Sequence, residues 1–425
     1  MNENILSYIW QFQYFDARNL ATEDKQALSI LRTGFRNRNA GPDFLEARLM
    51  IAGVQWIGSV EIHVRSSDWY QHAHDTNDAY EGVVLHVVWE DDGPVSRRDG
   101  TLLPCLALKK IADAGMIDRY RQLQDDEEVI PCHRSFGKIG MIHKYAMLDR
   151  VLLERLDRKA SEVMQLYHQA RQDWDTTAYQ WIGKHYGFKL NDPVFLRLTE
   201  AVPWKVVRKH RHNLLQVESL LFGGSGMLMP EYQDDYCRQL LREFGYLKSK
   251  YRLTHAIQMH EWKFARLRPA GFPTVRLAQF ARLICSEPNL FSMVVNAPSH
   301  AGLQSRLAEQ QSDYWTSHYV FEKTASGKVP AMGKGAVSML IINAMVPLLV
   351  AYARQKQQSN MLDRAMDWLS QIAAEDNYII RQWADLDMQV KTAADSQALI
   401  EWHHHYCVPK RCLECTVGAA LVRNA

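Results

Sequence analysis

The sequence has no large charge excess of either sign, because 50 Lys and Arg nearly balance 48 Asp and Glu for a net charge of +2. A chain dominated by one charge sign is thereby excluded, although a neutral total still permits a local basic groove for nucleic acid. Apolar residues make up 47% and charged residues 23%, which is typical of a folded chain rather than a disordered one. At 425 residues the chain is too long for one core, so two or three domains are expected.

A secretory signal is also lacking, because residues 1–10 contain acidic Glu3 and no basic segment before a long apolar run. One apolar stretch, 336–353, approaches the length of a membrane span. It contains Asn343 and Pro347 near its centre, so we expect a buried helix instead. Seven cysteines without a secretory signal argue for a reducing compartment and against a disulfide framework. We therefore expect a cytoplasmic protein that does not enter a membrane.

The first hundred residues are rich in short β-type runs. Alternating or β-branched segments predict strands at 28–31, 44–51, 54–64 and 83–90, with an edge strand at 102–108. Ala52-Gly53 suits a tight hairpin turn. Helical patterns at 5–14 and 68–74 complete the order α-β-β-β-α-β.

From about residue 139 the pattern changes to apolar residues at helical spacing, and this continues to about residue 397. Breaks are expected at 191–193, 223–226 and 269–273. The glycine-rich break lacks the Lys-Ser/Thr ending of a phosphate-binding loop. No internal repeat of fixed period and no low-complexity linker occurs.

Two acidic residues lie on neighbouring predicted strands, Asp43 at the start of one and Glu61 within the next. Asp43 follows Pro42 directly, and Glu61 and His63 share one face of the next strand because side chains alternate with period two. Carboxylate and carbonyl oxygens are the ligands that Mg²⁺ and Mn²⁺ prefer beside a scissile phosphate. We therefore expect Asp43, Glu61 and the carbonyl of Ile62 to bind such a metal.

The Pro42-Asp43 pair, the Glu61-Ile62-His63 segment and the element order resemble the core of PD-(D/E)XK nucleases of the RecB and restriction-endonuclease type. This resemblance covers about 28–90 and implies metal-dependent cleavage of DNA or RNA. The family has Lys where this chain has His63, which can act as acid, base or metal ligand. His74 and His86 are secondary candidates for ligation or proton transfer, and His86 needs a polar partner within its apolar strand.

Other interpretations of these residues stay open. Asp43 can cap a turn, Glu61 can pair with Arg48 or Arg65, and the histidines can be ordinary surface residues. Two further functions are compatible with the pattern. One is a catalytically degenerate nuclease fold that binds nucleic acid or a protein, and the other is a metallohydrolase of non-nuclease type that uses the histidines.

Longer strings of the sequence resemble a bacterial family known only as a domain of unknown function. They occupy positions 39–44, 58–63, 66–69, 85–88, 222–224, 267–269 and 407–412. The likeness therefore extends over nearly the whole chain. It implies family membership and no particular activity.

Three cysteines, Cys407, Cys412 and Cys415, form a C-x4-C-x2-C cluster that follows the histidines at 403–405. Such spacing predicts either a zinc site completed by one histidine or an iron–sulfur cluster completed by a distant cysteine, as in some RecB-like nucleases. Cys132 is the best distant candidate, and Lys410 next to the cluster would favour thiolates. Three reduced cysteines at a helical end are the plain alternative.

The densest basic run contains Arg208, Lys209 and Arg211, and a second group contains Arg266 and Arg268. These side chains are candidates for phosphate contacts with nucleic acid, and exposed helix faces are the ordinary alternative.

Together the patterns predict an α+β protein. A restriction-endonuclease-like domain is expected at 1–115, a connector at 116–140, a large all-α domain at 141–400 and a Cys-rich tail at 401–425. The expected function is divalent-metal-dependent phosphodiester hydrolysis.

Overall fold

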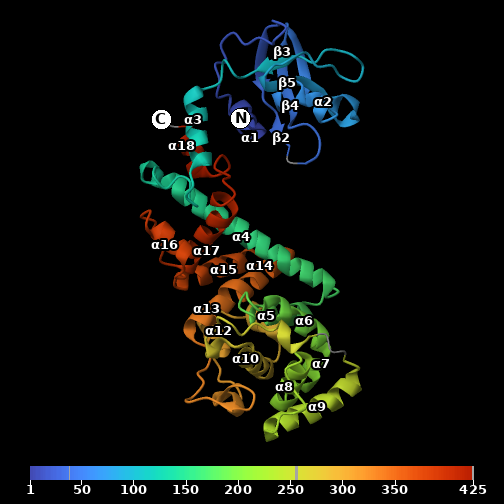
Figure 1. The fold of residues 1–425 in the computed structure, drawn as a ribbon, viewed down its shortest axis with the longest axis vertical. Coiled ribbons are helices and arrows are strands. Elements are labelled where there is room, and N and C mark those ends of the chain that lie inside the picture. Colours follow the sequence, from blue (N-terminus) through green and yellow to red (C-terminus); the bar gives the residue numbers. More distant parts are fainter. Residues whose placement is uncertain (38, 254–256, 424–425) are drawn as a thin grey trace. The chain divides into compact units, whose positions relative to one another are not determined.

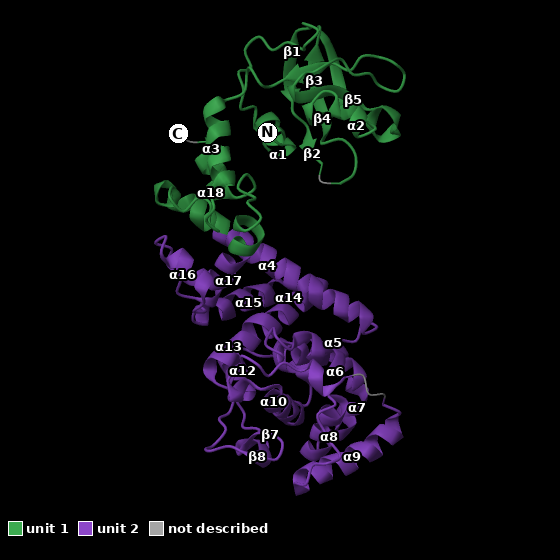
Figure 2. Ribbon diagram, viewed as in Figure 1, with its two compact units in different colours: residues 1–147, 402–425 green, residues 148–401 purple. Residues whose placement is uncertain are grey.

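The structure is a computed structural model, and it describes residues 1–37, 39–253 and 257–423. The chain forms two compact units (Figure 2). Unit 1 contains Met1–Met147 together with Trp402–Ala425, and unit 2 contains Leu148–Glu401. Both ends of the chain therefore belong to the same unit. The fold class is α+β, with a mixed sheet in the N-terminal part and a large helical part, as the sequence predicts.

The strands of unit 1 form one six-stranded sheet (Figure 1). Its order is β1-β3-β4-β5-β6, and β2 pairs with β3. The bounds are Leu28–Arg32 (β1), Phe35–Arg36 (β2), Phe44–Ile51 (β3), Val54–Arg65 (β4), Val83–Glu90 (β5) and Cys105–Ala107 (β6). β3 and β4 are antiparallel, whereas β5 runs parallel to both β4 and β6. The predicted strands are confirmed, including the edge position of the last one; the short strand β2 was not predicted.

The β3–β4 hairpin turns at the predicted dipeptide. Ala52 and Gly53 both have positive φ angles, 49° and 80°, which is the backbone of a type I′ turn. Further along β4, a Cβ atom on Gly58 would lie 2.4 Å from the Val84 side chain and 2.6 Å from the Gly82 carbonyl. Only glycine therefore lets β5 approach β4 at this point.

Two helices beside the sheet differ from their predicted bounds. Helix α1 (Glu3–Phe12) begins two residues early because the Asn2 side chain accepts a hydrogen bond from the Ile5 amide at 3.1 Å. The predicted helix 68–74 is instead α2 (Asp68–Gln71) followed by the 3₁₀ turn η1 (His74–Thr76). Ala73 between them has a φ of 56°, which a continuous helix does not allow.

The rest of unit 1 is helical. It contains α3 (Ala114–Asp125), the first turns of α4 (Met141–Gln169), a π-helical turn η8 (His403–Cys407) and α18 (Thr416–Arg423). Figure 1 shows α18 beside α3, and the Arg119 guanidinium on α3 donates to the Val422 carbonyl at 3.0 Å. The Cys-rich segment is thereby held against the chain that follows the sheet.

Unit 2 is almost entirely helical, as predicted. Its helices after α4 are α5 (Trp174–His185), α6 (Asp192–Ala201), α7 (Trp204–His210), α8 (Leu214–Gly224), α9 (Asp235–Tyr251), α10 (Pro273–Ser286), α11 (Leu290–Val295), α12 (His300–Leu307), α13 (Lys334–Leu340), α14 (Val346–Gln355), α15 (Ser359–Gln371), α16 (Tyr378–Ala384) and α17 (Ala393–Trp402). The small hairpin of β7 (His318–Val320) and β8 (Lys323–Thr324) was not predicted. Its strands are too short for period-two alternation to reveal them.

The apolar stretch expected at 336–353 lies within a helical run, Lys334–Gln355, formed by α13, a π-helical turn at Ile341–Met345 and α14. Among the described residues, this run is the one that is long and apolar enough to cross a membrane. In the structure, 72% of its apolar window is buried, in agreement with the expected buried helix.

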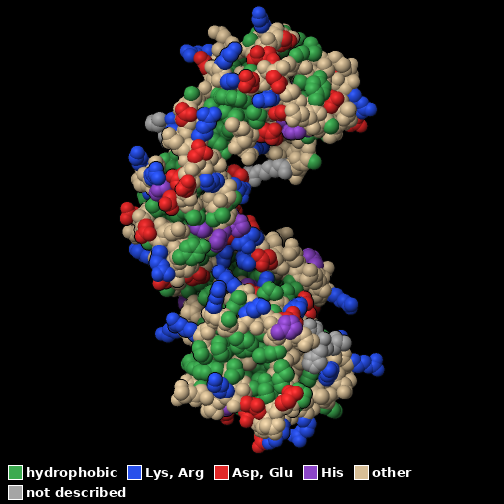
Figure 3. Space-filling view, viewed as in Figure 1, with side chains coloured by type: hydrophobic (Ala, Val, Ile, Leu, Met, Phe, Trp, Pro, Cys, Tyr) green, Lys and Arg blue, Asp and Glu red, His purple; other side chains and the backbone are tan. Residues whose placement is uncertain are grey.

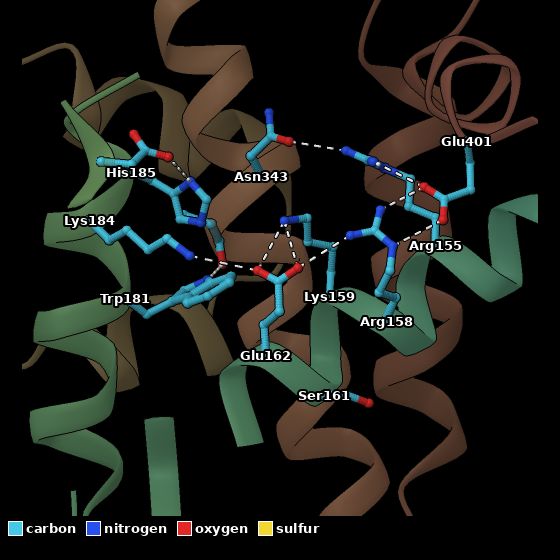
Figure 4. Close-up of polar contacts among 12 residues, drawn as sticks. Arg155, Arg158, Lys159, Ser161, Glu162, Trp181, Lys184, His185, Asn343 and Glu401 are labelled. Carbon is cyan, nitrogen blue, oxygen red and sulfur yellow. Dashed lines mark hydrogen bonds and ion pairs between the residues drawn. The ribbon is translucent and has the colours of Figure 1, made fainter. Parts of the chain in front are cut away.

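Asn343 in this run is satisfied inside unit 2, because it accepts from the Arg155 guanidinium at 3.1 Å and donates to the Met339 carbonyl at 3.0 Å (Figure 4). Arg155 lies 3.5 Å from a carboxylate oxygen of Glu401, which also accepts from Arg158. Buried charges are tolerated when they are paired in this way. The network explains the polar residue within an otherwise apolar helix.

Candidate functional site

The candidate site begins with two carboxylates that are braced across the β3–β4 pair. The Asp43 amide donates to Glu61 Oε2 at 3.1 Å, and the Ile62 amide donates to Asp43 Oδ2 at 3.0 Å. The antiparallel register, in which Phe44 is opposite Val60, makes these reciprocal bonds possible. These bonds fix the orientation of both carboxylates, and each carboxylate has a second oxygen that takes no part in them.

Two histidines lie beside the second carboxylate oxygen of Glu61, and a third histidine lies next to them. Glu61 Oε1 lies 3.2 Å from His74 Nε2 and 3.6 Å from His63 Nε2. One ring nitrogen each of His63, His72 and His74 lies within 4.8 Å of the other two. His63 comes from β4, His72 from the end of α2 and His74 from η1. A group of nitrogen ligands with an adjacent carboxylate has the composition of a transition-metal site.

His86 lies behind this group on β5, fully buried. Its Nε2 is 2.8 Å from His63 Nδ1, which makes the two rings hydrogen-bond partners. The parallel register that places Glu61 beside His86 brings the two strands together here. If His63 donates through Nδ1, its Nε2 carries a lone pair, and this nitrogen lies 3.1 Å from His72 Nδ1. From the sequence we expect a metal or the neighbouring acids as the polar partner of His86, and the partner in the structure is His63.

Burial sets the charge states of the site. Burial, followed by repulsion from Asp43, raises the pKa of Glu61 to about 9. Burial also raises the pKa of Asp43. The histidines shift in the opposite sense, because burial lowers the pKa of His63 to about 2, that of His86 to about 3 and that of His74 to about 4. At neutral pH the buried imidazoles are thus neutral, and the Glu61 carboxyl retains its proton.

Glu3 is a member of this neighbourhood that the sequence interpretation did not identify. It lies in the first turn of α1 and acts electrostatically on Glu61, raising its pKa further. Its own pKa is raised by partial burial and by Asp43, while His72 opposes the shift. His72 also lacked a predicted role. Because α1 and α2 reach the site through packing and not through the strand pattern, no sequence spacing indicated either residue.

Aromatic rings line the inner side of the site. Tyr80 stacks on His74 with ring centroids 3.6 Å apart, and Trp69 packs against His74 and His86 at 5.4 and 5.5 Å. His72 is exposed, so the site opens to solvent on that side. Figure 3 shows histidine beside acidic side chains at one edge of the strand-rich part of unit 1. The histidine and carboxylate groups of the candidate site thus combine a buried interior with an accessible rim.

The remaining predicted residues lie elsewhere. Cys132, Cys407, Cys412 and Cys415 belong to the helical segments of unit 1 and are all buried. Of the basic candidates in unit 2, Arg208 and Lys209 are exposed on α7, and Arg211 after it is partly buried. Arg266 and Arg268 are exposed in the segment before the 3₁₀ turn Pro269–Gly271. Exposure of these side chains is compatible with phosphate binding, which stays a prediction.

Comparison with known proteins gives one result. Neither the comparison with curated proteins nor that with solved structures found a match. A family model does match, over residues 3–378, and it includes the whole of the candidate site. The chain therefore belongs to the family described as "Protein of unknown function (DUF2851)".

Proposed function

We propose that unit 1 is a divalent-metal-dependent phosphodiesterase that acts on DNA or RNA. The observation that carries this proposal is the convergence of Asp43, Glu61 and three histidines at the junction of β3, β4 and β5. An antiparallel strand pair followed by a helix and a parallel strand also resembles the nuclease core suggested by the sequence. Fold resemblance alone does not give function, so the argument depends on the site.

The residues present fit a bound cation. Asp43 and Glu61 are buried acids with raised pKa values, and nearby positive charge would offset the cost of ionising them. The neutral imidazoles of His63 and His74 can each present a lone pair to a cation, and ligation by His63 Nε2 would replace its 3.1 Å contact with His72 Nδ1. A divalent cation bound here would polarise a phosphoryl oxygen and lower the pKa of a bound water. The imidazole content favours Mn²⁺ or another transition ion over Mg²⁺.

The protein groups divide into ligands, a positioning residue and a proton carrier. Asp43 and Glu61 would hold the cation, and their hydrogen bonds to backbone amides fix the orientation of both carboxylates. His86 is a positioning residue that holds the ring of His63 through the 2.8 Å contact. His72 at the exposed rim exchanges a proton with the leaving oxygen, because it has access to both solvent and the site.

Nucleic acid binding in this proposal extends beyond the acidic site. Arg208, Lys209, Arg266 and Arg268 of unit 2 present exposed guanidinium and ammonium groups, which suit phosphate contacts. Such contacts would explain how a chain with a net charge of only +2 binds a polyanion.

One observation favours a second candidate function. The site contains more histidines than a carboxylate-and-lysine nuclease site requires, and their ligand atoms cluster within 4.8 Å. Nitrogen-rich sites with one carboxylate and an open side also occur in zinc hydrolases. A metallohydrolase that cleaves small phosphate or amide substrates is therefore the alternative to a nuclease.

The proposal is tested by cleavage assays on labelled single-stranded DNA, duplex DNA and RNA with Mn²⁺ or Mg²⁺. Asp43→Asn and Glu61→Gln should each lower cleavage by at least about 100-fold, since even outer-layer changes at metal sites cost 10- to 100-fold. Glu46→Gln, which alters an exposed acid on β3, serves as the matched control and should keep full activity.

Unchanged cleavage in both site variants would overturn the assignment. Retention of uncut nucleic acid by the wild-type protein, with or without metal, would indicate a binding module that has lost catalysis. Hydrolysis of a small phosphodiester in the absence of any nucleic acid cleavage would favour the metallohydrolase.

A further inference from the structure

Two segments that together carry four cysteines of unit 1 are joined by hydrogen bonds, although the whole of unit 2 separates Cys132 from the other three in sequence. Cys132 follows α3, whereas Cys407, Cys412 and Cys415 lie in the C-terminal segment. Each has only 6–9% of its surface exposed. The tertiary fold brings the segments of these cysteines together, and the cysteines have no role in the proposed phosphodiesterase chemistry.

Specific hydrogen bonds hold the C-terminal turn against the chain that leads to Cys132. The Gln124 side chain donates to the Lys410 carbonyl at 3.0 Å, and the Lys410 ammonium donates to the Asp126 carbonyl at 2.9 Å. Further along, the Thr416 hydroxyl donates to the His143 carbonyl at 2.8 Å. The two segments are thus tied together on both sides of Cys132.

The turns that carry the cysteines are themselves well defined. Lys410 adopts a left-handed conformation with a φ of 52°, and its amide donates to the Cys407 carbonyl at 3.0 Å. The Cys415 amide donates to the Cys412 carbonyl at 3.3 Å, and α18 packs so closely that a Cβ on Gly418 would lie 2.3 Å from that carbonyl. The three C-terminal cysteines therefore lie in a compact segment with a defined backbone.

The thiols are close enough to influence one another. Burial raises the pKa of Cys132, and Cys415 and Cys412 add to the shift. The pKa of Cys407 is raised in the same way, by burial and then by Cys132, Cys415 and Cys412. Four thiolates in this position would repel one another strongly unless a cationic centre lay among them.

We propose that Cys132, Cys407, Cys412 and Cys415 bind an iron–sulfur cluster. The C-x4-C-x2-C spacing with one distant cysteine matches a known pattern of cluster ligands, with the isolated cysteine before the group in this chain. A preassembled cluster that carries four outer thiolate ligands would exchange them for the four cysteines. Four Fe–S bonds to the donor thiolates and four S–H bonds break, four Fe–Sγ bonds form, the cysteine protons pass to the released thiolates, and no electron is transferred. The cluster would link Cys132 to the C-terminal segment of unit 1 and so close a long loop of chain. A cross-link stabilises the folded state most when the loop that it closes is long.

The test uses the full chain purified without oxygen and measures iron, zinc and acid-labile sulfide together with the visible absorption spectrum. The wild-type protein should contain iron and sulfide in similar amounts and a broad visible band that dithionite bleaches. Cys132→Ser and Cys412→Ser should each lose most of the iron and the band. Cys105→Ser, at a cysteine as buried as Cys132 but located on β6, is the matched control and should retain both.

Zinc without iron or sulfide, or no metal at all, would overturn the proposal, as would a full cluster in Cys132→Ser. Should the serine variants fail to fold, Mössbauer spectra of iron-57-labelled wild-type protein decide whether a cluster is present. None of these readouts depends on cleavage, so failure of the proposed phosphodiesterase activity and failure of the cluster are distinguished.

Discussion

Metal binding at the Asp43–Glu61 site should release about one proton at pH 7. In the metal-free protein the pKa of Glu61 is about 9, because the carboxyl is buried and faces Asp43. At pH 7 a group with this pKa is about 99% protonated, and it must lose its proton to bind a cation. His63, His74 and His86 add nothing to this release, since their pKa values of about 2 to 4 leave them neutral already.

The sign and range of the pH dependence follow from this shift. Because the pKa of Glu61 is raised in the metal-free state and falls when a cation binds, affinity should increase with pH. The increase is about tenfold per pH unit below pH 9 and levels off above it, as one proton is released per ion bound. The pKa of Asp43 is also raised, so Asp43 can release a further proton when the cation binds in the acidic part of the pH range.

Isothermal titration of the apo-protein with Mn²⁺ in two buffers of different ionisation enthalpy measures the number of protons released. Glu61→Gln should lower that number by about one and make the remaining affinity nearly independent of pH between 7 and 9, since glutamine has no proton to lose. Wild-type affinity that does not change across this range, with no proton released, would refute the reasoning.

Two further predictions concern residues around the ligands. Glu3→Gln removes a negative charge that acts on Glu61. The substitution should weaken Mn²⁺ binding by roughly threefold to tenfold, which corresponds to a Coulomb effect of about 1 kcal/mol at a solvent-accessible position. An unchanged Mn²⁺ titration would show that Glu3 does not face the ion. His86→Leu should weaken Mn²⁺ binding by about 10- to 100-fold because the ring of His63 loses its partner, whereas His86→Gln should recover part of the affinity through its amide oxygen. Thermal unfolding of the metal-free His86→Leu protein should show a loss of about 1–3 kcal/mol, because the buried Nδ1 of His63 is left without its partner; equal binding by the leucine and glutamine variants would argue against a positioning role.

The strands and their turn were predictable because period-two alternation and a turn dipeptide are local signals. The same alternation placed Glu61 and His63 on one face of β4, and the antiparallel register then brings Asp43 beside them. The predicted pairing of the two carboxylates therefore agrees with the geometry of the structure. Their catalytic role is a separate matter and depends on the experiments above.

Other parts of the site could not be derived from spacing. His72 reaches the site because Ala73, in a left-handed conformation, ends α2 and redirects the chain into η1. Glu3 reaches it because Asn2 caps α1 early enough to put residue 3 in the first turn. The approach of Cys132 to the C-terminal cysteines depends on contacts across the whole of unit 1. Each of these depends on tertiary packing or a single backbone angle, neither of which leaves a periodic trace in the sequence.

The histidine at position 63 connects the electrostatics of the site with its need for a cation. A lysine there would carry a positive charge next to Glu61 and hold its pKa down, so the carboxylates could ionise without help. His63 is buried and neutral, and its pKa of about 2 means that it supplies no charge at any physiological pH. Arg36 and the backbone amides of Asp43 and Ile62 offset only part of the cost of ionising Asp43 and Glu61, whose pKa values stay raised, so a bound cation would supply the remaining positive charge. Under the proposed function, His63 in place of lysine would make the site more dependent on a bound cation, and the imidazoles near Glu61 could themselves ligate it.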